Sequence, residues 1–216
     1  EALHDQFVEK VSGYVKQFYG ETTDARRQSP DLCRLIHERH FDRVKSLLDD
    51  AVQRGATVTL GGKTSREERF IDPTVLTNVP DSAQIWEEEI FGPLLPVRTY
   101  QTLDEAIAYV NSKPKPLALY IFSSKNKSTE TLIRETRSGA VTVNDGSTHF
   151  YNLELPFGGA NNSGIGSCHG EFGFLAFSHA RGVLRQAKLF PTTNLLLPPY
   201  GSRLAKVVLE ALAKWL

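Results

Sequence analysis

Methionine is absent from the chain, cysteine occurs only twice, and charges of the two signs are balanced. With 25 Lys plus Arg against 25 Asp plus Glu, the 216 residues carry no general attraction to nucleic acid or to an anionic membrane. Cys33 and Cys168 are too few for a disulfide framework and lack C-x-x-C spacing, which favours a reducing compartment, the cytoplasm. No run reaches the roughly 18 apolar residues of a membrane span, so we expect a soluble protein without a membrane span.

The start of the chain also lacks a targeting segment. The residues EALHDQFVEK have neither the basic nor the apolar region of a signal peptide, and there is no initiator methionine. We therefore expect a chain that was trimmed, processed or cut from a longer protein. The composition, 40% hydrophobic and 23% charged, is that of a globular protein. A chain of this length can bury about 70% of its unfolded surface, which predicts one large domain with appendages.

Apolar spacing predicts two helices and the first strands in the N-terminal half. Apolar residues recur every three or four positions over residues 3–18, which predicts an amphipathic helix that ends before Gly20. Residues 41–52 predict a second helix with Gly55 as its left-handed cap, and the polar residues between the two helices are interpreted as a loop. Residues 57–60 predict a strand, and residues 70–76 are expected to be extended with a break at Pro73.

Strands and helices alternate further along the chain. A predicted strand over residues 95–100 is followed by a capping box, Thr102 to Glu105, which begins a helix. The apolar run at residues 117–122 predicts a strand buried on both faces, and after another helix residues 140–143 predict the next strand. This order indicates an α/β fold with a parallel-type sheet, in which βαβ crossovers are covered by helices.

The C-terminal end differs from the rest of the chain. Prolines at positions 191, 198 and 199 indicate an arm, and apolar residues then repeat along one face of a short helix, with two lysines and a glutamate opposite. We expect this helix to dock on its own domain or on a partner subunit; the alternative is binding to a membrane surface. The sequence therefore predicts two parts, residues 1–186 and residues 187–216.

Three consecutive acids, at positions 87–89, run directly into Ile-Phe-Gly-Pro. A charge run by itself usually indicates a solvated helix face. Here an acid and an aromatic ring stand two residues apart, at Glu89 and Phe91, next to a Gly-Pro turn. A carboxylate accepts two hydrogen bonds from a vicinal diol, and a flat ring beside it offers a positioning surface, so the two side chains can face one ligand.

A glycine-rich segment at residues 155–166 suggests a phosphate cradle at first sight. It lacks the Lys-Ser/Thr pair of a P-loop and does not open a dinucleotide fingerprint. Close backbone packing is therefore the better interpretation, and Phe157 can still line a pocket for an apolar substrate.

Histidine and cysteine predict neither a metal site nor a catalytic pair. His37 and His40 stand three residues apart without H-E-x-x-H spacing, so no metal is expected. Cys168 and His169 are adjacent, and adjacent residues rarely present their side chains to one another. A small thiol in a glycine-rich loop is therefore preferred to a nucleophile with its base.

Residues 88–93, together with residues 156–159 and 162–166, resemble the two signature stretches of the NAD(P)-dependent aldehyde dehydrogenases. Further matches, over residues 7 to about 200, are similar to the class 3 branch, which includes the fatty aldehyde dehydrogenases. They are Phe18-Tyr19-Gly20, Arg39-His40-Phe41, residues 71–76 and 115–120, Asn144-Asp145, His169-Gly170 and residues 177–179. The resemblance implies that residues 1–186 are a portion of the catalytic domain of an oxidoreductase that converts aldehydes to carboxylic acids.

The resemblance also implies a cofactor, NAD or NADP, and roles for four residues. Glu89 would hold the ribose hydroxyls of the nicotinamide half and Phe91 would help to position the nicotinamide, while Phe157 and His149 would line the pocket of a medium-chain or aromatic aldehyde. In the family, a cysteine thiolate attacks the aldehyde, a hydride passes to the nicotinamide, and water activated by a glutamate hydrolyses the thioester. A homodimer is also implied.

The departures from the family matter as well. The nucleophile motif, glycine-glutamine-x-cysteine, is absent, and neither Cys33 nor Cys168 is carried over as catalytic. The general base and the Rossmann domain have no counterpart either. We therefore expect the C-terminal part of a catalytic domain, with no catalytic residue of its own and no activity in isolation. The alternative is a non-catalytic assembly or binding module that retains the fold without the chemistry.

Overall fold

The computed structural model describes residues 2–186, 189, 198 and 203–214. The chain folds into two compact units. The first is Glu1–Pro114 with Ser123–Arg137, and the second is Lys115–Phe122 with Ser138–Leu216. Most of the expected arm lies outside the described residues, so the boundary at residue 186 stays a prediction.

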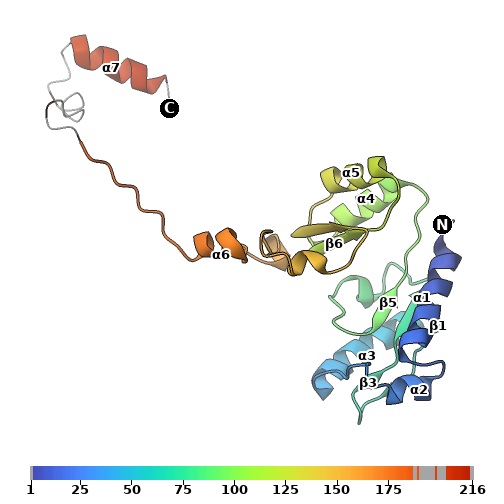
Figure 1. Cartoon of the computed structure of the whole chain (residues 1–216). Coiled ribbons are helices and arrows are strands. Elements are labelled where there is room, and N and C mark those ends of the chain that lie inside the picture. The colour runs from blue at the N-terminus through green and yellow to red at the C-terminus, as the bar shows by residue number, and fades with distance from the viewer. Residues whose placement is uncertain (1, 187–188, 190–197, 199–202, 215–216) are drawn as a thin grey trace. The chain divides into compact units, whose positions relative to one another are not determined.

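The first unit is built on a mixed sheet with the strand order β1-β4-β5 (Figure 1). β1 (Thr57–Leu60) runs antiparallel to β4 (Thr74–Thr77), and β4 runs parallel to β5 (Leu94–Pro96). A short hairpin of β2 (Thr64–Ser65) and β3 (Phe70–Ile71) precedes β4. Every residue of β4 is buried, as expected for the middle strand. The strands predicted around Pro73 are thus confirmed.

Helix α3 (Glu38–Gln53) contributes the apolar face that packs on this sheet. Its buried residues follow the predicted spacing; they are Phe41, Val44, Leu47, Leu48 and Ala51. They form one hydrophobic cluster with residues of β3, β4, β5 and the short helix η1 (Gln84–Trp86). The predicted cap is confirmed, since Gly55 follows the helix with φ +108°. The buried face of α3 therefore packs against residues of four other elements, β3, β4, β5 and η1.

The loop predicted after the first helix is wrong over residues 23–28. α1 (His4–Tyr19) ends at Gly20 as predicted, but α2 (Thr23–Gln28) then forms. The reason is a tertiary contact. Arg26 is only 4% exposed and donates hydrogen bonds to both oxygens of the buried Asp72 carboxylate, from Nε at 2.6 Å and from Nη2 at 2.9 Å. A helix stabilised by such a contact cannot be recognised from local spacing.

The later alternation of strands and helices is confirmed as one βαβ unit. α4 (Leu103–Ser112) begins at the predicted capping box of Thr102 and Glu105. β6 (Ala118–Ile121) and β7 (Ala140–Val143) are parallel strands that the chain connects through α5 (Asn126–Glu135). They form a sheet of their own in the second unit, so the described α/β fold contains one mixed sheet, the antiparallel β2–β3 pair and one parallel sheet instead of the single sheet expected.

Two strands differ from the prediction in burial or length. β6 was expected to be buried on both faces, but Tyr120 is 41% exposed and the neighbouring Phe122 is 71% exposed. Among the described residues β6 pairs only with β7, and its residues are less buried than those of β4. The strand predicted over residues 95–100 ends at Pro96, because its partner β4 ends at Thr77.

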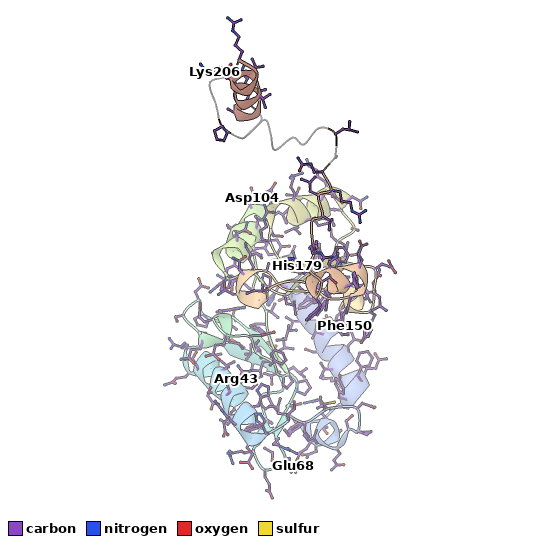
Figure 2. The ribbon with its side chains drawn as sticks, turned by 90° about the vertical axis from the view of Figure 1, so that its left-hand side faces the viewer. Arg43, Glu68, Asp104, Phe150, His179 and Lys206 are labelled. Atoms are coloured by element: carbon purple, nitrogen blue, oxygen red, sulfur yellow. The ribbon has the colours of Figure 1, made fainter. Side chains whose placement is uncertain are left out.

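The remaining elements are short and follow β7. They are η2 (Thr148–Phe150), η3 (Asn161–Ser163), α6 (Gly170–Ala176) and α7 (Arg203–Ala213). α7 confirms the helix predicted near the C-terminus, and Figure 2 labels Lys206 on it. In the part of the chain that the structure describes, no helix is both long and apolar enough to span a bilayer.

The buried ion pair between Arg26 and Asp72 can be tested by Asp72→Ala. This substitution leaves a guanidinium buried without its carboxylate, so the free energy of unfolding should fall by about 3–5 kcal/mol, as measured by urea denaturation. The control is Asp42→Ala, which removes an exposed partner of Arg66 at 2.8 Å and should change stability little. Equal losses in the two variants would contradict the assignment.

Candidate functional site

The acidic segment, residues 87–93, lies between η1 and β5, and the three carboxylates at positions 87–89 have different surroundings. Glu87 accepts a hydrogen bond from Lys113 Nζ at 2.5 Å, and this contact raises the pKa of Lys113. Glu88 forms an ion pair with Arg43 Nη1 at 3.4 Å. Glu89 is exposed, and within the described residues its carboxylate has no hydrogen-bond or ion-pair partner. Glu89 is thus the acid of the three that is left available to a ligand.

Two side chains of α3 hold the backbone of this segment. Arg43, labelled in Figure 2, donates from Nη1 to the Glu89 carbonyl at 3.0 Å and from Nη2 to the Ile90 carbonyl at 2.6 Å. His40 Nε2 lies 2.7 Å from the Phe91 carbonyl, and because a carbonyl only accepts, Nε2 carries the hydrogen. Three successive carbonyls are therefore bound by two residues that are one helical turn apart.

Phe91 and Gly92 show how tightly the segment lies on α3. Phe91 has a left-handed backbone with φ +46°, and its side chain is 70% exposed. A Cβ on Gly92 would lie 2.7 Å from Val44 Cγ1, so only glycine allows this approach. The segment thus presents the Phe91 ring and the Glu89 carboxylate outward while its backbone rests on the helix.

The short helix η1, which precedes the segment, is also held by α3. Asp50 accepts a hydrogen bond from the Gln84 amide at 2.8 Å and another from Arg54 Nε at 2.7 Å. Both contacts lower the pKa of Asp50, and the contact with Gln84 has the larger effect. A lowered pKa means that this contact stabilises the fold above the ordinary aspartate pKa, and that the contribution is lost as the pH falls through the lowered value.

A second candidate site is an aromatic cluster in the second unit. The Phe157 ring lies between two imidazoles, with centroid distances of 5.7 Å to His149 and 5.5 Å to His169. The Phe150 ring, labelled in Figure 2, meets Phe157 edge-on at 5.0 Å. Tyr120 of β6 completes the cluster at 5.9 Å from His149. Stacked and edge-on rings at these distances stabilise one another and fix the orientation of Phe157.

A pocket of about 250 Å³ opens beside this cluster. Its lining is mostly apolar; the residues are Leu117, Ala118, Tyr120, Ser147, His149, Phe150, Tyr151 and Phe157. His149 is only 8% exposed, and its Nδ1 lies 2.9 Å from the Thr142 hydroxyl. The other imidazole nitrogen, Nε2, is buried without a hydrogen-bond partner among the described residues. The pocket suits an apolar or aromatic group.

The glycine-rich segment packs closely against its own backbone, as the sequence indicated. Phe157 and Cys168 exchange two backbone hydrogen bonds, and the Cys168 thiol also donates to the Phe157 carbonyl at 3.2 Å. A Cβ on Gly158 would lie 2.1 Å from the Gly166 carbonyl oxygen. These contacts fix the backbone of Phe157. They also direct the Cys168 thiol to a carbonyl rather than to His169.

The site residues predicted from the sequence lie in both units. Glu89 and Phe91 belong to the first unit, and His149 and Phe157 lie together in the second. His37, considered as a metal ligand, instead accepts a hydrogen bond from the His40 amide at the start of α3. The described residues contain no group of three or more potential metal ligands.

Sequence reasoning missed the roles of His40 and Arg43. Residues 40, 43 and 44 share the spacing of one helix face, which is the signal that could have indicated a shared contact. Nothing local shows that the contact is made to carbonyls of residues 89–91.

Comparisons with known proteins identify the fold and the family of the chain. The Aldehyde dehydrogenase family profile matches residues 1–183. Aldehyde dehydrogenase family 3 member A2 of Rattus norvegicus is 45% identical over 198 residues, which are 92% of this chain and 39% of the relative. The 4,4'-diaponeurosporen-aldehyde dehydrogenase of Staphylococcus aureus is 39% identical, over 94% of this chain and 43% of the relative.

A solved structure gives the same result. The substrate-bound state of Staphylococcus aureus AldH superposes with a TM-score of 0.83 at 37% identity, covering 98% of this chain and 44% of that chain. The fold is therefore that of an aldehyde dehydrogenase catalytic domain. The chain belongs to the aldehyde dehydrogenase family, and the class 3 resemblance is confirmed. It spans about two fifths of the length of the curated relatives it matches.

Gly158→Ala tests the close packing that fixes Phe157. The added Cβ meets the Gly166 carbonyl, so stability should fall by about 1–3 kcal/mol, measured by thermal unfolding. Gly146→Ala is the matched control, because nothing lies within 4 Å of a Cβ at that position. A Gly158 variant as stable as the control would show that the segment can move aside.

Proposed function

We propose that the protein that contains this chain oxidises aldehydes to carboxylic acids with NAD or NADP, and that the chain supplies part of its catalytic domain. The observation that carries the proposal is the difference in pairing among the three carboxylates at positions 87–89. Glu87 and Glu88 are paired with Lys113 and Arg43, while the Glu89 carboxylate is exposed and has no partner among the described residues. That carboxylate lies two residues from the exposed ring of Phe91.

The chemistry of these two side chains fits the nicotinamide half of the cofactor. The Glu89 carboxylate can accept hydrogen bonds from both hydroxyls of a ribose, and the Phe91 ring can support a flat heterocycle. When bound, NAD(P) supplies the hydride acceptor of the oxidation. The glycine-rich segment at residues 155–166 is closed on itself, so we assign it no phosphate. The choice between NAD and NADP is left open.

No Gly-Gln-x-Cys sequence occurs in the chain, and none of its residues is proposed as catalytic. The Cys168 thiol donates to the Phe157 carbonyl, and Cys33 is an exposed free thiol without the family motif. We therefore propose that the isolated chain does not turn over aldehydes, because a hydride step needs a covalently held substrate next to the cofactor.

Glu89→Gln in the full gene product tests the cofactor site. The substitution keeps the size and removes the charge that strengthens the hydrogen bonds to a diol, so the KM for NAD(P) should rise about tenfold or more while the KM for the aldehyde stays unchanged. Glu87→Gln is the matched control, since that carboxylate is paired with Lys113. Equal effects of the two substitutions, or no effect of Glu89→Gln, would overturn the assignment.

We further propose that the pocket next to Phe157 and His149 receives the apolar part of a small-molecule aldehyde, either a medium-chain aliphatic group or an aromatic ring. Support comes from the aromatic lining and from the fixed orientation of Phe157 between two imidazoles. A mostly apolar pocket binds such groups by burying their area and requires few hydrogen bonds.

Phe157→Ala in the full gene product tests this pocket. Loss of the ring removes apolar contact, and kcat/KM for a medium-chain or aromatic aldehyde should fall about tenfold, with the KM for NAD(P) unchanged. Phe122→Ala, at a side chain that is 71% exposed and outside the pocket lining, serves as the control. If both variants behave alike, or if Phe157→Ala leaves aldehyde kinetics intact, the pocket has another role.

Self-association and compartment complete the proposal. Phe172, Phe174 and Phe177 are exposed in and beside α6, and exposed apolar side chains in one place often mark a protein interface. We propose a homodimer.

Both cysteines are free, which supports a reducing compartment, the cytoplasm.

A further inference from the structure

We propose that His40 and Arg43 are positioning residues for the cofactor, which act through the backbone of residues 89–91. This inference rests on the proposed function, because it assumes that Glu89 and Phe91 meet the nicotinamide half. It adds two residues of α3 that would not touch the cofactor themselves.

The contacts fix the peptide units of the segment one after another. The Arg43 guanidinium binds the carbonyls of Glu89 and Ile90, and His40 Nε2 binds the carbonyl of Phe91. The direction of each carbonyl is coupled to the rotation of its peptide unit. Fixing three successive carbonyls therefore fixes the directions in which the side chains of residues 89 and 91 leave the backbone.

The segment needs such support because one of its residues has an unfavourable backbone conformation. Phe91 has φ +46°, a region that a bulky L-residue rarely adopts unless the surroundings impose it. Val44 closes the space beneath Gly92, and the His40 ring meets the Phe91 ring edge-on at 6.5 Å. Without the two donors on α3, nothing else among the described residues holds the carbonyls of residues 89–91.

These two side chains contribute little to the core of the fold. Arg43 is half-buried, and within the described chain its guanidinium donates hydrogen bonds only to residues 88–90. The core contacts of α3 come from other positions, such as Phe41, Leu47 and Leu48. Helix initiation uses the His40 amide and the His37 ring, so it does not need the His40 imidazole. Removing either side chain should loosen the segment and leave the unit folded.

Arg43 combines two tasks that a test can separate. Its charge pairs with Glu88, and its planar fork binds two carbonyls at once. Arg43→Lys keeps the charge but cannot reproduce the fork, whereas Arg43→Ala removes both. His40→Gln keeps a donor of similar reach, and His40→Ala removes it.

The experiment uses the full gene product and compares four variants, Arg43→Ala, Arg43→Lys, His40→Ala and His40→Gln. Three quantities are measured: the Kd for NADH by fluorescence titration, the rate of cleavage after residues 87–89 by a glutamate-specific protease, and the thermal midpoint. We expect Arg43→Ala to raise the Kd about tenfold, the loss associated with a charge-assisted hydrogen bond, and to speed cleavage. Arg43→Lys should lie between it and the unchanged protein, and His40→Gln should recover part of the loss in His40→Ala.

Arg66→Ala is the matched control, because Arg66 also contacts α3 but pairs with the exposed Glu38 and Asp42. The inference is overturned if Arg43→Ala and His40→Ala change neither NADH affinity nor cleavage while Glu89→Gln weakens NADH binding. It is also overturned if affinity falls only in proportion to a lowered thermal midpoint, which indicates a purely structural role. If Glu89→Gln itself leaves NADH binding unchanged, the proposed function fails instead.

Discussion

The apolar face of α3 is the contact on which the first unit depends. Its buried residues join β3, β4, β5 and η1 into one cluster, which fixes where the chain leaves η1 and where it enters β5. The acidic segment is the connection between these two points. Since both ends are held by the same helix, the segment has little freedom, and polar residues on that helix can bind its carbonyls. Burial and site geometry thus have a common origin.

The helices and strands that depend on local patterns could be predicted from the sequence. Gly20 and Gly55 mark helix ends, and the capping box at Thr102 begins α4, because each involves only neighbouring residues. α2 was missed: its one local signal is the Thr22 cap, and its contact from Arg26 to Asp72 spans 46 positions. The exposure of β6 was also missed, since an apolar run shows the composition of a strand and not which elements cover its faces.

The candidate site residues also divide into features that local patterns indicate and features that depend on contacts between distant residues. The sequence indicated Glu89 and Phe91 by their types and spacing, and the family resemblance indicated Phe157 and His149. What it could not indicate is which of three adjacent acids lacks a partner, because that depends on Lys113 and Arg43, each far away in the chain. Likewise, the spacing of His37 and His40 predicted no metal site, but spacing alone cannot show that the His40 imidazole reaches a carbonyl 51 positions later.

Both candidate sites orient an aromatic side chain through its backbone, but by different means. Phe91 is fixed by side-chain donors from a neighbouring helix, and Gly92 permits the close approach. Phe157 is fixed by backbone pairing with Cys168, and the neighbouring glycines permit the chain to fold closely on itself. The backbone contacts leave Phe91 70% exposed, whereas the Phe157 ring is also packed between the imidazoles of His149 and His169. Glycine follows both aromatic residues directly, because a Cβ on Gly92 would lie 2.7 Å from Val44 and a Cβ on Gly158 would lie 2.1 Å from the Gly166 carbonyl oxygen.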